Sequence, residues 1–209
     1  EAKRERFEFD WRTCLEDGFC PPFGLTHYGR CCRVVKEKYA DIANNSKQQH
    51  STSCCGSTSC CGDDQYTVFS ENYNNLDGYN PDADLGLGCG IPTEFAQIKP
   101  GDIVIDLGSG AGNDCFVARA LVGEKGTVIG VDFTEAMIEK ARENADKLGY
   151  NNVEFRYGDI EKLPIAMNKA DVVISNGVLN MMLDKAATLA EWRRILKPGG
   201  RLQIGDILV

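Results

Sequence analysis

Residues 102–114 constrain the fold more than any other stretch, because they combine an apolar run, a glycine-rich turn and the start of a helix. The run 103–105 (Ile-Val-Ile) is the short continuous apolar segment typical of a parallel strand covered on both faces. Gly108, Gly110 and Gly112 then allow a tight turn in which the backbone approaches a ligand closely. Nucleotide-like ligands bind at the carboxyl end of such a strand. The stretch therefore predicts a cofactor site at this turn.

The residues around the turn favour S-adenosylmethionine (SAM) over a dinucleotide. A G-x-G-x-x-G fingerprint needs its third glycine at position 113, which is Asn113. Asp106 at the strand end and Asp114 in the first helical turn would repel a pyrophosphate, but they suit a ligand with a sulfonium and an amino group. A second expected strand, 127–131, is followed by Asp132, which is placed to accept both hydroxyls of a ribose. We therefore predict SAM as the cofactor.

Beyond the turn, strand-like and helix-like segments alternate, which predicts an α/β fold of the Rossmann-like, doubly wound type with a mostly parallel sheet. Strands are expected at residues 103–105, 127–131, 153–156, 170–175 and 201–208. Thr134 is expected to cap a helix over 135–148. Asp184 is expected to cap a further helix, and the Lys-Pro-Gly-Gly segment 197–200 to form the turn before the fifth strand.

Three regions are expected along the chain. Residues 1–33 form an unassigned N-terminal arm, and residues 34–84 contain a short helix, a cysteine-rich loop and a segment that covers one end of the sheet. Residues 85–209 form the SAM-binding core. Within the core, Asp159 follows the third expected strand and can accept a hydrogen bond from the exocyclic amine of adenine.

Charge and composition narrow the classes of partner. The formal net charge of −8 argues against a nucleic-acid or anionic-membrane surface, since phosphate binding needs clustered lysine and arginine. No apolar run approaches the length of a membrane span, and the charged N-terminus lacks a signal-peptide core, so we expect a cytoplasmic protein. In such a chain, ten cysteines are more often metal ligands or redox groups than structural disulfides.

Four cysteines form a tandem Ser-Cys-Cys-Gly repeat with a six-residue period, at Cys54, Cys55, Cys60 and Cys61. Core packing does not explain these thiols, because the surrounding serines and glycines offer no apolar neighbours. Clustered thiols suit a soft, thiophilic metal or metalloid. The alternative is a redox-labile segment with no part in catalysis.

Cys89 has a different setting from the paired cysteines. Segment 85–92 alternates glycines around this one cysteine, which leaves the thiol uncrowded and lets the backbone pass close to another group. Because the segment directly precedes the cofactor strand, we expect Cys89 to lie beside the cofactor as a functional thiol. Cys115 lies within an expected helix and is predicted to be structural.

From about residue 34 to its end, the chain resembles the arsenite SAM methyltransferases. The glycine turn alone marks only the broad SAM-methyltransferase class, whereas the Gly-Cys-Gly segment and the Ser-Asn-x-Val-x-Asn segment are more specific. Residues 1–32 do not share the pattern. The resemblance is carried by the paired cysteines and by the motifs Val35-Lys36-Glu37-Lys38-Tyr39-Ala40, Leu85-Gly86-Leu87-Gly88-Cys89-Gly90, Asp106-Leu107-Gly108-Ser109-Gly110-Ala111-Gly112, Val131-Asp132-Phe133-Thr134, Gly158-Asp159-Ile160-Glu161 and Ser175-Asn176-Gly177-Val178-Leu179-Asn180.

This resemblance implies transfer of the sulfonium methyl group of SAM to thiol-bound trivalent arsenic, with reducing thiols as co-reactants. Trivalent arsenic keeps a lone pair that can attack the methyl group in line, so no general base is needed. The resemblance also implies that Cys89 is a functional thiol that binds arsenic. It further implies SAM contacts from Asp106, Gly108, Ser109, Gly110, Asp132, Phe133, Met137, Ile160, Glu161 and Asn176.

Two departures from the family pattern concern the arsenic ligands. In the family a cysteine follows the asparagine of the Ser-Asn segment, where this chain has Gly177, and another ligand cysteine and further strands lie beyond the fifth strand. These departures predict weak or lost arsenite methylation with SAM binding retained. Two other functions are compatible with the sequence: methylation of a small organic acceptor, or thiol-based binding of a metalloid without catalysis.

Overall fold

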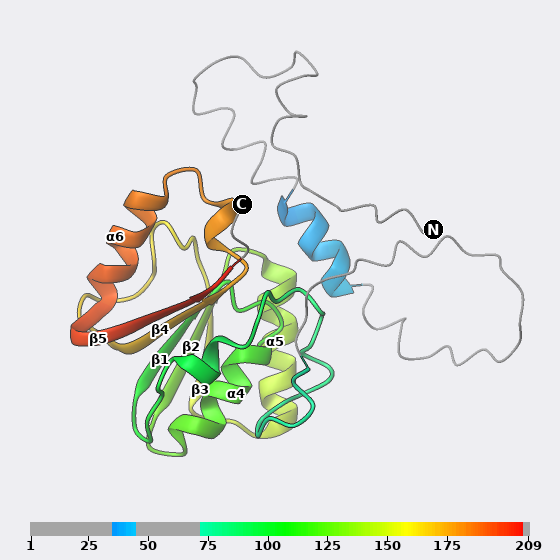
Figure 1. Cartoon of the computed structure of the whole chain (residues 1–209). Coiled ribbons are helices and arrows are strands. Elements are labelled where there is room, and N and C mark those ends of the chain that lie inside the picture. The colour runs from blue at the N-terminus through cyan, green and yellow to red at the C-terminus, as the bar shows by residue number, and fades with distance from the viewer. Residues whose placement is uncertain (1–34, 45–71, 207–209) are drawn as a thin grey trace, which may run out of the picture.

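The computed structural model describes residues 35–44 and 72–206, and its centre is a five-stranded sheet (Figure 1). All neighbouring strands are parallel, in the order β3-β2-β1-β4-β5. The strands are β1 (Ile103–Leu107), β2 (Thr127–Asp132), β3 (Val153–Tyr157), β4 (Ala170–Asn176) and β5 (Leu196–Gly205). The strand order reverses between β1 and β4, which is the position where open α/β sheets bind ligands at their carboxyl edge.

Helices cover both faces of the sheet, with α4 and α5 on one side and α6 on the other (Figure 1). The named helices are α3 (Pro92–Phe95), α4 (Asn113–Val122), α5 (Glu135–Leu148), the 3-10 helix η1 (Leu179–Met181) and α6 (Lys185–Ile195). The parallel sheet between two helical layers confirms the predicted Rossmann-like, doubly wound fold.

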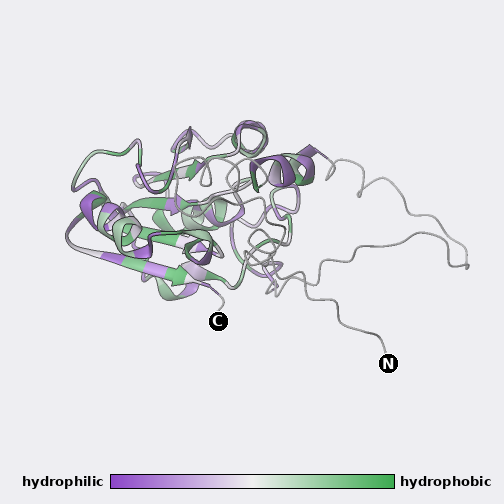
Figure 2. Cartoon of the chain, turned by 90° about the horizontal axis from the view of Figure 1, so that it is seen from above, coloured by the Kyte–Doolittle hydropathy of each residue, from purple (hydrophilic) through white to green (hydrophobic). Residues whose placement is uncertain are grey.

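Successive residues of a central strand are buried on opposite faces of the sheet. Val104 belongs to a core cluster with Phe116 of α4, whereas Ile105 belongs to a second cluster with Trp192 of α6. This arrangement explains why the strands are continuous apolar runs rather than alternating ones. Figure 2 shows hydrophobic residues concentrated along the strands. Full burial of each such side chain contributes about 1.5–3 kcal/mol.

The fifth strand begins earlier than the sequence predicts. Ala170 pairs with Leu196, and the next paired residues are Val172 and Arg201, so residues 197–200 form an irregularity inside the strand. The predicted turn at Lys-Pro-Gly-Gly is therefore a bulge within β5 rather than a connection that precedes it. Pairing resumes at Arg201, which was the predicted first residue of the strand.

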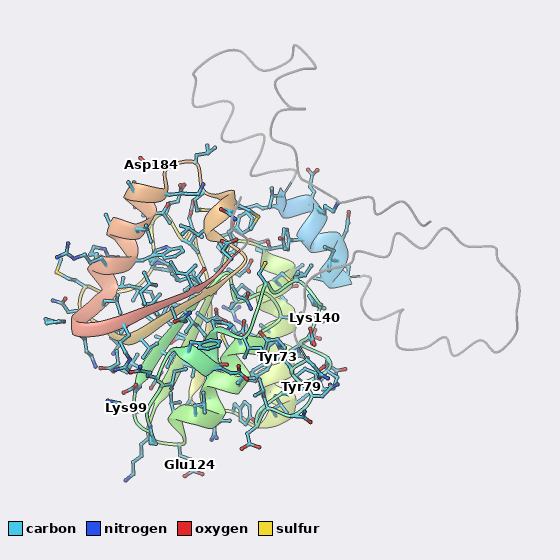
Figure 3. The ribbon with its side chains drawn as sticks, viewed as in Figure 1. Tyr73, Tyr79, Lys99, Glu124, Lys140 and Asp184 are labelled. Atoms are coloured by element: carbon cyan, nitrogen blue, oxygen red, sulfur yellow. The ribbon has the colours of Figure 1, made fainter. Side chains whose placement is uncertain are left out.

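Both predicted N-cap residues are confirmed, but only one of them caps its helix through its side chain. Thr134 is the N-cap residue of α5, but its side chain makes no capping hydrogen bond. Its backbone N–H instead donates to Asp132 Oδ1 at 2.8 Å, so the carboxylate of the preceding strand fixes the helix start. At α6 the prediction is confirmed, because Asp184 Oδ1 accepts from the N–H of Ala187 at 2.9 Å (Figure 3).

A helix over residues 35–44 lies beside the carboxyl ends of the strands (Figure 1). Lys36 Nζ lies 5.4 Å from the ring centre of Phe133 and 5.3 Å from that of Tyr157, and it donates to the Tyr157 hydroxyl at 2.9 Å. Lys140 Nζ of α5 donates to the carbonyl of Ala43 at 3.3 Å. These contacts attach the helix to the edge of the sheet where the cofactor site is predicted. Within the described ranges, no helix is long and apolar enough to cross a membrane.

Candidate cofactor and acceptor site

The glycine turn follows β1 and is held to the neighbouring strand. The backbone N–H groups of Gly108 and Ser109 both donate to the carbonyl of Val131, at 2.8 and 3.1 Å. Gly112 has φ +99°, and a Cβ built there would lie 2.8 Å from the ring of Phe155. Glycine at position 112 is therefore required both by backbone conformation and by the close approach of the ring.

Asp132 at the end of β2 is bonded directly to this turn. Its Oδ2 accepts from the N–H of Gly110 at 3.0 Å, and its Oδ1 accepts from Thr134. Each carboxylate oxygen has two lone pairs, so both oxygens can still accept from the hydroxyls of a ribose. The adjacent Ser109 hydroxyl is buried and has no hydrogen-bond partner among the described residues. An orphaned hydroxyl beside an acceptor pair fits a polar ligand at this turn.

Three buried carboxyl groups surround the turn, and burial is the first cause of a raised pKa in each. The pKa of Asp106 is raised well above its usual range by burial and then by the charge of Asp114. The Cys115 thiol donates to Asp106 Oδ2 at 3.2 Å and opposes part of this rise in pKa. Burial likewise raises the pKa of Asp114 and Asp132. Closely spaced buried acids favour a cationic ligand, because a cation offsets both their burial and their mutual repulsion.

We expect Asp106→Asn to stabilise the ligand-free protein at neutral pH and to weaken SAM binding. Because the native pKa is raised, the native state binds more protons than the unfolded state above about pH 4, so stability falls as pH rises through the raised pKa. The neutral amide removes this cost and can still accept from Cys115. The melting temperature should rise by about 2–4 °C per kcal/mol recovered.

Thermal unfolding of both proteins across pH measures this effect, and the difference in melting temperature should vanish below about pH 4. The pKa of Asp171 is lowered, so its contribution to stability is lost only as the pH falls below the usual carboxyl range. Asp171 is present in both proteins, so this loss does not affect the difference between their melting temperatures. A lower melting temperature for Asp106→Asn at neutral pH would show that the buried carboxyl stabilises the fold.

Asn176, the last residue of β4, joins the Cys89 segment to the sheet. Its Oδ1 accepts from the N–H of Cys89 at 2.7 Å, and its Nδ2 donates to the carbonyl of Gly90 at 2.9 Å. A Cβ built on Gly88 would lie 2.7 Å from Nδ2 of Asn176. The glycine at position 88 therefore permits the close approach of this segment to the carboxyl end of β4.

The Cys89 thiol faces position 177. A Cβ built on Gly177 would lie 3.0 Å from the Cys89 sulfur, and Gly177 has φ +70°. Cys89 is half-buried, and its pKa is raised by burial and then by Asp206. The thiol thus lies at the same edge of the sheet as the buried acids and directly against position 177.

Tyr39 of the helix over 35–44 is close enough to both parts of the site to sense their charges. Its pKa is raised by burial, then by Asp132 and then by Cys89, and its hydroxyl lies 4.0 Å from the sulfur of Met181. Sequence reasoning assigned no site role to this tyrosine. The motif at residues 35–40 was the available signal, but only the structure brings Tyr39 over the carboxyl edge.

The remaining predicted residues lie around Asp132 or outside the described chain. The N–H of Gly158 donates to the carbonyl of Asp132 at 2.9 Å, which brings the segment after β3 beside the ribose acid. In that segment Asp159 is exposed, Ile160 is buried and Glu161 is half-buried. Met137 is buried in α5, in the first turn after Thr134. Cys54, Cys55, Cys60 and Cys61 lie outside the described residues, and within those residues no group of three or more potential ligands could hold a metal ion.

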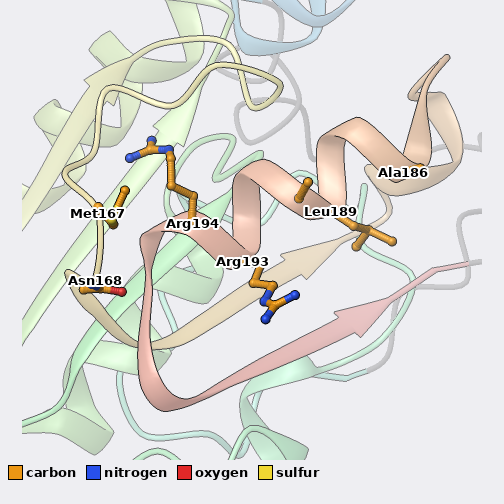
Figure 4. Close-up of a pocket in the computed structure, with 7 residues that line it drawn as sticks. Met167, Asn168, Ala186, Leu189, Arg193 and Arg194 are labelled. Atoms are coloured by element: carbon orange, nitrogen blue, oxygen red, sulfur yellow. The ribbon is translucent and has the colours of Figure 1, made fainter.

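A separate pocket lies on the outer side of α6 (Figure 4) and contains none of the predicted site residues. Its lining includes Met167, Asn168, Leu189 and Arg193. It is distant in the fold from the carboxyl edge of the sheet, because residues 167 and 168 precede the amino end of β4. We therefore centre the candidate site on the carboxyl ends of β1, β2 and β4.

Known proteins with similar sequences and structures agree with this reading. The family model of a methyltransferase domain matches residues 98–208. An arsenite methyltransferase from Halobacterium salinarum is 44% identical over 84% of this chain and 46% of its own length. The structure of an arsenic(III) S-adenosylmethionine methyltransferase from Chlamydomonas reinhardtii shares 46% identity, covering 56% of this chain and 42% of that one, with a TM-score of 0.51.

A SAM-dependent methyltransferase from Aquifex aeolicus has a TM-score of 0.53 and 31% identity, covering 60% of this chain and 66% of that one. The chain spans about half the length of the curated relatives it matches, 46% and 49% for two arsenite methyltransferases. The similarity confirms the predicted fold and the predicted resemblance to arsenite methyltransferases.

Proposed function

The chain belongs to the methyltransferase-domain family, and we propose that it transfers the sulfonium methyl group of SAM to thiol-bound trivalent arsenic. The observation that carries the proposal is the position of the Cys89 thiol, which Asn176 holds at the same sheet edge as Asp106 and Asp132. A methyl donor and a thiophilic acceptor would meet at this edge. The similarity to arsenite methyltransferases supports arsenic as the acceptor.

In this proposal the acids and the glycine turn hold the cofactor. Asp132 accepts the ribose hydroxyls, and Asp106 lies where the positively charged part of SAM reduces the cost of its burial. Gly108, Ser109 and Gly110 let the backbone approach the ligand. Phe133, Met137, Asp159, Ile160, Glu161 and Asn176 are the further proposed contacts, and they remain predictions from sequence.

The acceptor chemistry needs a thiolate and no general base. Arsenic bound to the sulfur of Cys89 would keep a lone pair for the new As–C bond. SAM, held by the acids and the glycine turn, would supply the methyl group, and its sulfur would take the electron pair of the broken C–S bond. The arsenic is thereby oxidised by two electrons, and free thiols supply the electrons that return it to the trivalent state. We therefore propose that small thiols are partners of the reaction and that it takes place in a reducing compartment, the cytoplasm. The net charge of −8 is the reason that we propose no nucleic-acid partner.

Positioning and exclusion of water are the remaining tasks of the site. The helix over 35–44 contacts Phe133 and Tyr157 through Lys36, and Met181 through Tyr39, at the carboxyl edge of the sheet. Correct alignment of two reactants lowers a barrier by about 7 kcal/mol or more in favourable cases. The helix is thus the proposed cover of the reaction site.

Gly177→Cys tests arsenic as the acceptor, because it adds a thiol-bearing side chain whose Cβ lies 3.0 Å from the Cys89 sulfur. The matched control is Gly177→Ala, which has the same backbone strain of about 1–2 kcal/mol without the sulfur. We expect slow arsenite methylation by the wild type, and a kcat/KM about tenfold higher for Gly177→Cys than for Gly177→Ala, equivalent to about 1.4 kcal/mol.

Methylated arsenic is measured by chromatography with arsenic-specific mass detection. If neither the wild type nor Gly177→Cys methylates arsenite while both bind SAM, the acceptor is not arsenic. Methyl transfer to an organic acceptor that survives replacement of every cysteine would establish the competing function.

A further inference from the structure

We infer that Tyr73 and Asp114 are positioning residues, which act through Asn176 to fix the Cys89 thiol beside the cofactor site. This inference rests on the proposed function of Cys89. It adds Tyr73, which no sequence motif identifies, and it gives Asp114, one of the three buried acids around the turn, a second role. The four residues come from three parts of the fold: the segment before α3, the first turn of α4 and the end of β4.

The orientation of the Asn176 amide is set from both of its ends. Its oxygen faces the N–H of Cys89, which is a donor, and its nitrogen faces the carbonyl of Gly90 and Asp114 Oδ2, which are acceptors at 2.9 Å each. A flipped amide would place a donor against the Cys89 N–H and its oxygen against the two acceptors. One side chain therefore holds the backbone at residues 89 and 90 in a single arrangement.

Tyr73 and Asp114 both accept hydrogen bonds from the Asn176 amide nitrogen. The Tyr73 hydroxyl lies 2.8 Å from Asp114 Oδ1, 2.7 Å from the carbonyl of Gly90 and 3.3 Å from Asn176 Nδ2. Tyr73 is only 4% exposed, and its ring stacks on Tyr79 with the centroids 6.3 Å apart (Figure 3). Asp114 is buried in the first helical turn of α4, where the helix dipole favours its negative charge.

The charge state of the network keeps these bonds in place. Burial and the adjacent Asp114 raise the pKa of Tyr73, so its hydroxyl keeps its proton and remains a donor. The hydrogen bonds from Asn176 and Tyr73 oppose the rise that burial causes in the pKa of Asp114. A hydrogen bond to a charged group contributes about 1.5–3 kcal/mol, roughly twice a neutral one. Loss of the Tyr73 hydroxyl therefore removes a charged hydrogen bond from Asp114, the carboxylate that accepts directly from the amide.

The network also connects the acceptor thiol to the cofactor acids. The charge of Asp114 raises the pKa of Asp106, the proposed partner of the cationic part of SAM. Cys89 lies between Gly88, whose Cα is packed against Asn176, and Gly90, whose carbonyl is bonded to both Asn176 and Tyr73. The backbone that carries the thiol is thus held by side chains that do not themselves contact the reacting atoms.

Tyr73→Phe tests the inference, because it removes one hydroxyl and keeps the stacked ring. The matched control is Tyr150→Phe, whose ring packs on Phe116 near the amino end of β3. We expect Tyr73→Phe to lower kcat for arsenite about tenfold while KM and the Kd for SAM stay within about twofold. Alkylation of Cys89 by iodoacetamide, followed on its peptide by mass spectrometry, should become at least about twofold faster. Tyr150→Phe should change none of these quantities.

Asp114→Asn provides a second variant, with a side chain of nearly equal size, if Tyr73→Phe melts below the assay temperature. Because Asp114 is also one of the buried acids of the cofactor site, only the faster alkylation of Cys89 is expected in common. Unchanged kcat and unchanged Cys89 alkylation in the folded variant would overturn the inference. A parallel loss of SAM affinity in Tyr73→Phe would also overturn it, because Tyr73 would then support the whole site rather than the thiol. If the wild type methylates no arsenic, the proposed function fails, but the alkylation rates still decide whether Tyr73 positions Cys89.

Discussion

Cys89→Ser lowers the methylation of arsenite by at least about 100-fold, equivalent to about 2.8 kcal/mol, and leaves the Kd for SAM within about twofold. The physical reason is the softness of the acceptor, since trivalent arsenic binds thiolate far better than a neutral hydroxyl. SAM binding is retained, because the backbone N–H of residue 89, rather than its side chain, makes the bond to Asn176. Product analysis and calorimetric titration with SAM measure the two quantities separately.

The matched control for this variant is Cys115→Ser. Its serine hydroxyl can still donate to Asp106 in the buried position that the Cys115 thiol occupies, so most of the activity should remain. Equal arsenic methylation by Cys89→Ser and wild type would contradict the role of Cys89. A joint loss of SAM affinity would place Cys89 in the cofactor site instead.

Asp132→Asn weakens SAM binding about 100-fold, because several hydrogen bonds to a charged acceptor, each contributing about 1.5–3 kcal/mol, are lost or disturbed. The two oxygens of Asp132 accept from the N–H groups of Gly110 and Thr134. An amide turns one of these oxygens into a donor that faces another donor, and it also removes the charge that would bind the ribose hydroxyls.

Calorimetric titration with SAM measures this loss, and Asp146→Asn is its control. Asp146 lies on the exposed side of α5, so the same change of charge occurs outside the site and should leave the Kd unchanged. A Kd within threefold of the wild type for Asp132→Asn would mean that this carboxylate does not contact the cofactor.

The sheet was predictable from the sequence because its signals are local. Each central strand is an apolar run covered by helices on both faces, as the opposite placement of Val104 and Ile105 shows. The boundary of β5 was not predictable, because pairing between Ala170 and Leu196 lies on the far side of a four-residue irregularity. The pairing of Leu196 with Ala170 depends on the position of the neighbouring strand β4 rather than on the sequence of β5 itself.

Part of the candidate site was predictable for a similar reason. Parallel strands bring their carboxyl ends to one edge, so Asp106 and Asp132 could be expected together once each strand was located. The support of Cys89 could not be expected, because it joins residues 73, 114 and 176 through side-chain hydrogen bonds. Tyr39 was missed for the same reason, since its helix reaches the site only through tertiary contacts.

The proposal that this chain methylates arsenic beside a SAM site is tested most directly by following a labelled methyl group. The purified chain is incubated with arsenite, glutathione and SAM that carries a deuterated methyl group. The arsenic species are then separated by chromatography, and their masses are measured by mass spectrometry. We expect methylarsenic that carries the label, in amounts equal to the demethylated cofactor formed, and no such product from Cys89→Ser. Bound SAM with no labelled arsenic product would contradict the proposal.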